Sequence, residues 1–357
     1  MKRFEAEITG LGEWYPETVR GNDAWPPGFG EASRVAAQRE LIDVNAERAA
    51  PEERAVLEHL LREAADPFLG TVRRRVAPAD FTAAEAEALA GRAALAVAGV
   101  DPKQVDVLTS WAAAPDRLTP SSALKAAHLL GATRACAYGM DAGCATPMMQ
   151  LIAAAALIET GRARHVLMVH SHVITRAFPM GHPASPNVGD GATAILMSRS
   201  ERASLLASHA ASHGEYYEAV TWRRPADDPP WWKDGAPFYL GSHDKDGAQH
   251  LVRNTVRFGA QTVKEMMDRA EVPVSQIDAI ASVQPRRWIP GSIASALGLS
   301  PEIAPQTFDE YAHLGGVGMF TNLIEARRRG LLKSGSRVAL YAQGAGFTRA
   351  AALLHWF

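Results

Sequence analysis

The feature that most constrains the fold of this 357-residue chain is an internal repeat. Three stretches of the first half match stretches of the second half in the same order: 98–108 with 270–280, 157–169 with 326–340, and 189–196 with 344–351. The first two pairs lie 172 residues apart when Asp106 is aligned with Asp278 and Val166 with Val338. A repeat of this length indicates duplication of one folding unit. We therefore expect two halves, residues 1–200 and 201–357.

The repeated stretches also indicate the fold class. The repeated stretches contain the end of a helix or a turn, followed by an apolar strand. Strands therefore alternate with helices along both halves. Strands that are apolar throughout are typical of sheets buried on both faces, as in α/β proteins. We therefore predict an α/β fold built from two similar halves.

Composition excludes several classes of protein. The chain is 47% hydrophobic and 21% charged with a net charge of −2, which does not favour a nucleic-acid or membrane surface. Its N-terminus lacks the apolar core of a signal peptide, and the longest apolar run, 151–158, is too short to cross a bilayer. Two cysteines, Cys136 and Cys144, form no disulfide framework, so we expect a cytoplasmic protein.

Cys144 lies where a strand-like segment gives way to a long apolar helix, within residues 138–148. A thiol at a helix start meets free backbone N–H groups and the positive end of the helix dipole. These features lower a thiol pKa and favour the nucleophilic thiolate. The alternative is that Cys144 is only a small buried residue.

The repeat suggests a partner for Cys144. A helix starts between the matched strands of each half, at Cys144 in the first and near residues 313–318 in the second. Two helix starts related by a pseudo-twofold axis face one another, which would bring the Cys144 thiol and the His313 imidazole into one cavity. Cysteine with histidine is the usual pair for thiol nucleophilic catalysis. A capping or packing role for His313 is the alternative.

Several motifs occur in the order found in one known family, at residues 8–16, 71–76, 144 with its helix, 188–192 and 342–348. The chain resembles the thiolase superfamily, specifically β-ketoacyl-acyl-carrier-protein synthase III. The resemblance implies a thiolase-like fold with α/β/α/β/α layers, a homodimer, and an acyl-CoA or acyl-carrier-protein thioester as substrate without a resident cofactor or metal. Residues 30–66 form a helical insertion longer than the family normally carries.

The resemblance breaks at the catalytic positions. Cys144 falls on the family's nucleophile, but Val283 occupies the place of the family's histidine, and only Gln284 of that motif remains. His313 stands where the family has asparagine, and resembles the thiolase histidine that partners the nucleophilic cysteine.

This departure bears on the reaction. Valine donates no hydrogen bond, and loss of one oxyanion donor typically costs about 10²–10³ in rate. By resemblance, the N–H groups of Cys144 and Ala345 still hold the thioester oxygen. We therefore expect acyl transfer from Cys144 to an oxygen or nitrogen acceptor, in a polyketide or fatty-acid-related natural-product pathway. The alternatives are decarboxylative Claisen condensation, with Gln284 or water replacing the histidine, and a non-catalytic partner subunit of a ketosynthase heterodimer.

Other side chains are candidates for substrate binding or support. Asp116 occupies a loop that faces the nucleophile in the family, where it either orients a histidine, acts as a base or is a solvated charge. Arg286 and Arg287 replace a motif that contacts the thioester, so we expect them to meet phosphates of CoA or a carrier protein, or an acidic acceptor.

Aromatic and histidine clusters complete the candidates. Trp222, Trp231 and Trp232 lie beside cations between the halves, where they either grip a pantetheine arm, an acceptor ring or a partner protein, or only close the pocket. His170 and His172 share one strand face. Zinc would need further ligands, so we expect them to have a loop or core role.

Overall fold

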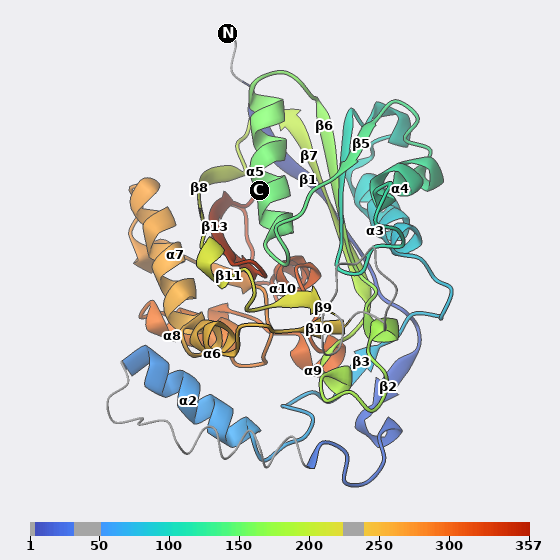
Figure 1. Ribbon diagram of the computed structural model, residues 1–357. Helices are drawn as coiled ribbons and strands as arrows, with labels where there is room; N and C mark the ends of the chain where they lie inside the picture. Colours follow the sequence, from blue (N-terminus) through green and yellow to red (C-terminus); the bar gives the residue numbers. More distant parts are fainter. Residues whose placement is uncertain (1–3, 32–50, 224–238) are drawn as a thin grey trace.

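Two β-sheets face one another across a pair of helices in the computed structural model, which describes residues 4–31, 51–223 and 239–357 (Figure 1). The first sheet has the strand order β1 (Glu5–Trp14), β7 (Gly191–Ser200), β6 (His165–His172), β4 (Val107–Ala112) and β5 (Cys136–Gly139). The second sheet has the order β11 (Ala279–Ser282), β12 (Arg337–Gly344), β13 (Thr348–His355) and β8 (Leu205–Ser212).

The register of the strands reproduces the sequence repeat. In the first sheet Val107 of β4 pairs in parallel with Val166 of β6, and in the second Ala279 of β11 pairs in parallel with Val338 of β12. Both pairs are related by the same offset of 172 residues that the sequence shows. In each sheet an antiparallel strand follows, β7 beside β6 and β13 beside β12. The prediction of an α/β fold with similar halves is confirmed.

Three layers of helices enclose the two sheets, which gives the expected α/β/α/β/α arrangement. The central layer consists of α5 (Thr146–Glu159) and α10 (Val317–Arg328), and the outer layers consist of α3 (Ala83–Ala98) with α4 (Ser122–Leu130) and of α7 (Thr255–Arg269) with α8 (Ile289–Ala296). Side chains along β6 point alternately to the two faces of the sheet. Val166 and Met168 face the central helices, whereas Leu167 packs with α3 on the outer face. The central helices and both sheets share one hydrophobic core.

The predicted insertion at 30–66 contains α2 (Pro51–Glu63), while residues 32–50 lie outside the described part of the chain. Figure 1 shows α2 along the lower edge of the molecule, beneath α6 (Lys245–Arg253) and α8. His59 of α2 stacks on Trp288, with ring centroids 4.7 Å apart and planes 4° apart. The remaining described helix and strands are short: β2 (Val19–Gly21), β3 (Arg73–Arg75), β9 (Thr221–Arg223), β10 (Tyr239–Gly241) and α9 (Phe308–Tyr311). None of the helices in the described ranges is long and apolar enough to cross a bilayer.

Glu87 is a fully buried carboxyl group of α3. Three hydroxyl groups donate to its Oε1 atom, from Ser110 at 2.9 Å, Ser122 at 3.2 Å and Ser171 at 2.9 Å. Burial raises the pKa of Glu87 from 4.5 to about 8. The folded protein therefore holds this proton more tightly than the unfolded chain does.

A pH-dependent loss of stability follows from this shift. The contribution of the protonated Glu87 is complete below pH 4.5 and is lost as the pH rises toward about 8, with a slope of at most about 1.4 kcal/mol per pH unit. Glu87→Gln keeps a neutral acceptor for the serine hydroxyls and removes the titration. Urea unfolding at pH 5 to 9 should therefore show a shallower fall in unfolding free energy for the variant than for the wild type. Equal slopes for the two proteins would contradict this account.

Candidate active site

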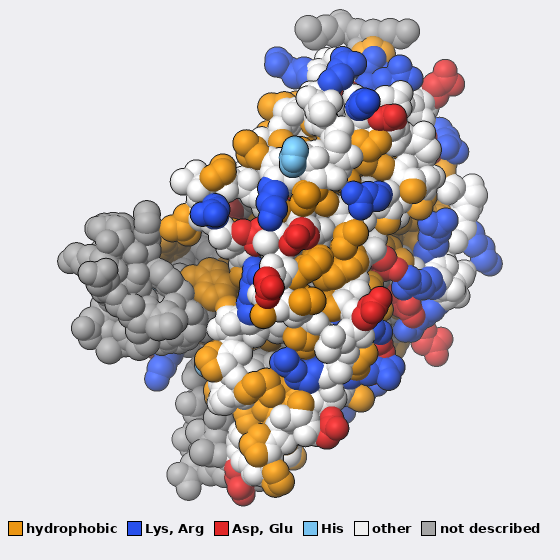
Figure 2. Space-filling view, turned by 90° about the vertical axis from the view of Figure 1, so that its right-hand side faces the viewer, with side chains coloured by type: hydrophobic (Ala, Val, Ile, Leu, Met, Phe, Trp, Pro, Cys, Tyr) orange, Lys and Arg blue, Asp and Glu red, His pale blue; other side chains and the backbone are white. Residues whose placement is uncertain are grey.

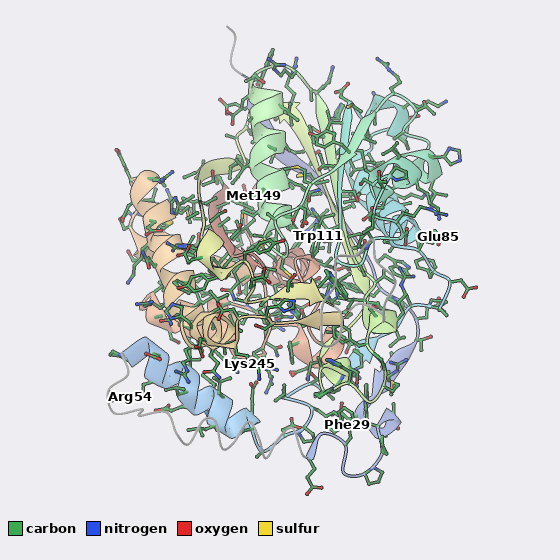
Figure 3. All side chains as sticks on the ribbon, viewed as in Figure 1. Phe29, Arg54, Glu85, Trp111, Met149 and Lys245 are labelled. Atoms are coloured by element: carbon green, nitrogen blue, oxygen red, sulfur yellow. The ribbon has the colours of Figure 1, made fainter. Side chains whose placement is uncertain are left out.

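Cys144 lies in a tight turn between β5 and α5. The turn is closed by Thr146, whose hydroxyl accepts from the N–H of Ala142 at 2.7 Å and donates to the carbonyl of Gly143 at 2.7 Å. Helix α5 starts at Thr146 with Ala145 as its N-cap, so the prediction that the helix begins at Cys144 was wrong by two residues. Asp141 braces the turn by accepting from the N–H of Gly143 at 2.9 Å and from the indole of Trp111 at 3.3 Å. Figure 3 shows Trp111 near the middle of the molecule.

Glycines allow two other backbone segments to reach Cys144. A Cβ atom on Gly344, at the end of β12, would lie 2.8 Å from the nitrogen of Cys144. A Cβ atom on Gly316, just before α10, would lie 2.8 Å from the carbonyl oxygen of Cys144. The turn after β12 also reaches Gly143, where a Cβ atom would lie 2.7 Å from the nitrogen of Ala345. The N–H of Ala345, expected by resemblance to bind the thioester oxygen, is therefore next to the cysteine turn.

Burial decides the protonation of the thiol. It raises the pKa of Cys144 from 9 to about 11, while hydrogen bonds from the backbone at Gly316 and at Cys144 itself lower it by less. The prediction that the helix start lowers this pKa was wrong, because desolvation of the thiolate outweighs the backbone N–H groups. The resting thiol is neutral and needs a base to become a nucleophile.

Alkylation should report this shift. With the exposed Cys136 replaced by serine, the rate of iodoacetamide addition to Cys144 should rise about tenfold per pH unit from pH 7 to pH 10, because the thiolate fraction at pH 8 is only about 10⁻³. Mass spectrometry of the quenched protein measures the rate. A plateau reached below pH 8 would show that the site favours the thiolate.

His313 lies on the backbone segment that leads into α10, three residues before Gly316. Its N–H donates to the carbonyl of Asn187 at 3.0 Å, and its carbonyl accepts from the N–H of Gly189 at 3.1 Å. The imidazole Nδ1 donates to the carbonyl of Gln284 at 3.1 Å, because a carbonyl oxygen can only accept. Nε2 therefore carries a lone pair. Cys144 precedes the start of α5 and His313 precedes the start of α10. The two starts are in contact because Gly316 packs against Cys144.

The environment keeps His313 neutral. Burial, together with the neighbouring His172 and Arg286, lowers the pKa of its imidazole from 6.5 to about 3. A neutral imidazole with a free Nε2 lone pair can accept a proton from a thiol or from an acceptor molecule.

Gln284 does not serve as the predicted side-chain donor. Its amide is fully buried, where Nε2 donates to the hydroxyl of Thr307 at 2.8 Å and Oε1 accepts from Asn322 at 3.0 Å. Only its backbone carbonyl reaches His313. Val283, at the position of the family's histidine, is 1% exposed and belongs to the central hydrophobic core.

Asp116 has a structural role instead of the predicted roles as an orienting group, a base or a solvated charge. Its carboxylate accepts from the first N–H groups of α3, at Ala83 (2.8 Å) and Ala84 (3.2 Å). Arg176 lies 3.4 Å from the same carboxylate. Asp116 therefore caps α3, where a negative charge is stabilised by the helix N-terminus.

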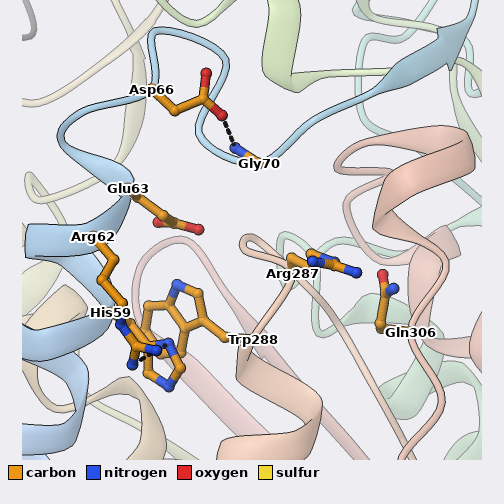
Figure 4. Close-up of a pocket in the computed structure, with 8 residues that line it drawn as sticks. All are labelled: His59, Arg62, Glu63, Asp66, Gly70, Arg287, Trp288 and Gln306. Atoms are coloured by element: carbon orange, nitrogen blue, oxygen red, sulfur yellow. Dashed lines mark hydrogen bonds between the residues drawn. The ribbon is translucent and has the colours of Figure 1, made fainter.

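The two arginines after Gln284 differ in their surroundings. Arg286 is half-buried, with Nε 3.8 Å from Oε2 of Glu63 on α2. Arg287 is exposed, forms a 2.9 Å ion pair with Asp309 and lines a cavity of about 500 Å³. In Figure 4 the α2 side chains face Arg287 and Gln306 across this cavity, whose lining consists of His59, Arg62, Glu63, Asp66, Gly70, Arg287, Trp288 and Gln306.

The predicted tryptophans fall in different parts of the chain. Trp222 is partly buried against a small apolar cluster that includes Ile174, Phe178 and Val188. Trp231 and Trp232 lie outside the described residues.

Sequence reasoning expected a loop or core role for His172 and missed that it lies beside His313. It ends β6, and its ring centroid lies 5.8 Å from that of His313. The repeat contained the signal, because the offset of 172 residues aligns His172 with Gly344, which touches Cys144. Gly344 lies beside the start of α5, so its counterpart His172 should lie beside the start of α10. It does so, at Gly315.

Comparison with known families supports the resemblance seen in the sequence. A model of 3-oxoacyl-[acyl-carrier-protein] synthase III matches residues 138–214, and a model of the C-terminal part of that enzyme matches residues 267–356. The chain is 30% identical over 287 residues to beta-ketoacyl-[acyl-carrier-protein] synthase III of Sphingopyxis alaskensis, covering 79% of this chain and 86% of the relative. The enzyme of the same name from Synechococcus sp. is 29% identical over 296 residues, covering 80% and 86%.

Solved structures share the fold at lower identity. The 3-oxoacyl-[acyl-carrier-protein] synthase III of Aquifex aeolicus superposes with a TM-score of 0.78 at 22% identity, covering 98% of this chain and 100% of that chain. The priming β-ketosynthase of the R1128 polyketide pathway gives a TM-score of 0.78 at 21% identity, covering 99% and 97%. OleA of Xanthomonas campestris, solved with lauric acid and lauroyl-CoA, gives 0.74 at 18% identity and covers both chains fully.

Proposed function

Because the chain belongs to the β-ketoacyl-[acyl-carrier-protein] synthase III family of thiolase-like, acyl-transferring condensing enzymes, we propose that it transfers acyl groups through an S-acyl-Cys144 intermediate. The observation that carries this proposal is the meeting of three backbone segments at one thiol. The cysteine turn, the glycine turn at Gly344 and the segment from His313 to Gly316 all converge there.

In the first half-reaction an acyl-CoA or acyl-carrier-protein thioester is the donor. His313 Nε2 takes the Cys144 proton as Sγ attacks the thioester carbon, and the N–H groups of Cys144 and Ala345 bind the oxyanion. The donor's carbon–sulfur bond then breaks, and the departing thiolate receives the proton. Because the thiol and the imidazole are both neutral at rest, the proton moves during the attack and not before it.

In the second half-reaction we propose that an oxygen or nitrogen acceptor takes the acyl group. Condensation with a malonyl thioester needs side-chain donors for the enolate, but Val283 has none and the Gln284 amide is engaged by Thr307 and Asn322. An alcohol or amine needs only a base that accepts its proton, which His313 supplies. A polyketide or fatty-acid-related pathway stays a prediction.

Intact-mass measurement separates this function from its alternatives. The protein is incubated with acetyl-CoA and octanoyl-CoA, each with and without malonyl-CoA. We expect an acyl adduct on Cys144 and no carbon dioxide release. Release of carbon dioxide with a β-keto product would establish Claisen condensation, and the absence of an adduct with every donor would favour a non-catalytic partner subunit.

We further propose that Arg287, with Trp222 and the half-buried Arg286, contributes to binding of the donor. Arg287 and Arg62 place two guanidinium groups on the cavity beside α2, a setting that suits phosphate oxygens of CoA or of a carrier protein's phosphopantetheine arm. The proposed acyl transfer requires no cofactor or metal ion.

A homodimer is the assembly we propose. Strand β5 ends the order of the first sheet, and its residues Cys136 and Tyr138 are exposed. Figure 2 shows hydrophobic side chains gathered on this side of the molecule, which α3, α4 and β5 form. Exposed large hydrophobic residues on or next to α4 and β5 are Leu118, Leu124, Leu129 and Tyr138. Light scattering of the purified protein tests this assembly.

A further inference from the structure

We propose that His172 is a second base of this active site, which shares with His313 the proton released by the acyl acceptor. The inference rests on the proposed acyl-Cys144 chemistry and adds a residue to it.

The imidazole of His172 has a defined tautomer. It is 3% exposed at the end of β6, and its Nδ1 donates to the carbonyl of Gly189 at 2.7 Å. Nε2 of the neutral ring therefore carries a lone pair. The N–H of Gly189 donates to the backbone carbonyl of His313, so the same residue contacts the ring of His172 and the backbone of His313.

His172 lies next to His313 and close to the nucleophile. The two rings meet edge to face at 65°, with centroids 5.8 Å apart. A Cβ atom on Gly315 would lie 2.7 Å from Cδ2 and 3.1 Å from Nε2 of His172. The Nε2 edge therefore faces the backbone one residue before Gly316, whose backbone hydrogen-bonds the Cys144 thiol.

The surroundings keep the pair neutral and allow it one proton at a time. Burial lowers the pKa of His172 to about 4, and His172 in turn lowers the pKa of His313. A proton on either imidazole therefore disfavours a second proton on the other.

His170 shows what a packing histidine on the same strand looks like. Its ring stacks on Phe320 of α10 at 5.5 Å, and its Nδ1 lies 3.3 Å from the hydroxyl of Thr193. The predicted core role describes His170. His172 is buried as a core residue is, but it also adjoins a second imidazole and the glycine segment at the thiol.

The proposed step needs no further reactant. As the acceptor oxygen or nitrogen forms its bond to the acyl carbon, its proton moves to Nε2 of His172 or His313. The bond between that carbon and Cys144 Sγ breaks, and the proton passes to Sγ to restore the thiol.

Single-turnover decay of the acyl-enzyme tests this role. The protein is loaded with octanoyl-CoA and freed of donor, and loss of the acyl mass is followed in buffer with water alone and with hydroxylamine as acceptor. In His172→Asn the amide can still donate to the carbonyl of Gly189 but offers no base. We expect acylation within about twofold of wild type and decay slowed about 10²-fold, the lower end of the usual effect of losing a proton-transfer group.

The matched control is His165→Asn on the same strand. His165 also uses Nδ1, with the hydroxyl of Ser198 at 2.9 Å, but lies at the other end of β6. This variant should acylate and decay as wild type does. Thermal unfolding checks both proteins, and His172→Gln replaces His172→Asn if the latter does not fold.

The outcomes distinguish the two proposals. Decay of His172→Asn at the wild-type rate, or equal slowing of acylation and decay, would overturn the role of His172 while leaving the acyl-enzyme intact. Failure of the wild type to form any acyl-enzyme would overturn the proposed function itself.

Discussion

Cys144→Ala should form no acyl-enzyme with any thioester donor, and release of CoA from acyl-CoA should fall by at least about 10⁴-fold. The expected loss is this large because Cys144 carries the thiol at which the backbone segments converge, and alanine offers no nucleophile in its place. Intact mass measures the adduct, and a thiol reagent measures CoA release. Wild-type activity in Cys144→Ala would remove the covalent mechanism.

The second cysteine provides the matched control. Cys136 lies on the exposed edge strand β5, eight residues before Cys144. Cys136→Ala should acylate at the wild-type rate. An adduct that disappears in Cys136→Ala and persists in Cys144→Ala would show that Cys136, and not Cys144, is the nucleophile.

His313→Asn should slow acylation of Cys144 by about 10²–10⁴-fold, the usual contribution of a positioned base. The effect is large because burial keeps the thiol protonated, so the imidazole must take the proton during attack. Asparagine retains an amide donor for the carbonyl of Gln284 and removes only the base. Stopped-flow or quenched intact-mass measurements with octanoyl-CoA give the rate.

Specificity of the His313 effect is checked with His128→Asn, on the exposed side of α4. This variant should behave as wild type. If His313→Asn acylates normally but no longer passes the acyl group on, His313 acts only in the second half-reaction. Normal rates in both steps would end the proposed pairing of Cys144 with His313.

The repeat made most of the fold predictable. Duplicated strands carry their register with them, so the offset that aligns Asp106 with Asp278 recurs in the pairing of β4 with β6 and of β11 with β12. The layers followed from the resemblance. The sequence could not show that α5 starts two residues after Cys144, because this spacing depends on the hydroxyl of Thr146, which closes the turn.

The candidate site was predicted less completely, because its chemistry depends on long-range contacts. Asp116 caps a helix that starts 33 residues earlier, and the Gln284 amide binds Thr307 and Asn322 far along the chain. The thiol pKa likewise depends on how deeply the whole fold buries Cys144. The local sequence indicates a helix dipole that lowers the thiol pKa, but it does not indicate the desolvation that raises this pKa.

The core shared by α5, α10 and both sheets has a consequence for unfolding. Side chains from before and after residue 200 pack in that one cluster, among them Met148 and Leu151 from α5 and Met319 and Phe320 from α10. Neither half can lose its packing without exposing apolar surface of the other. The duplicated halves therefore behave as a single cooperative unit, which melts in one transition despite its two-part ancestry.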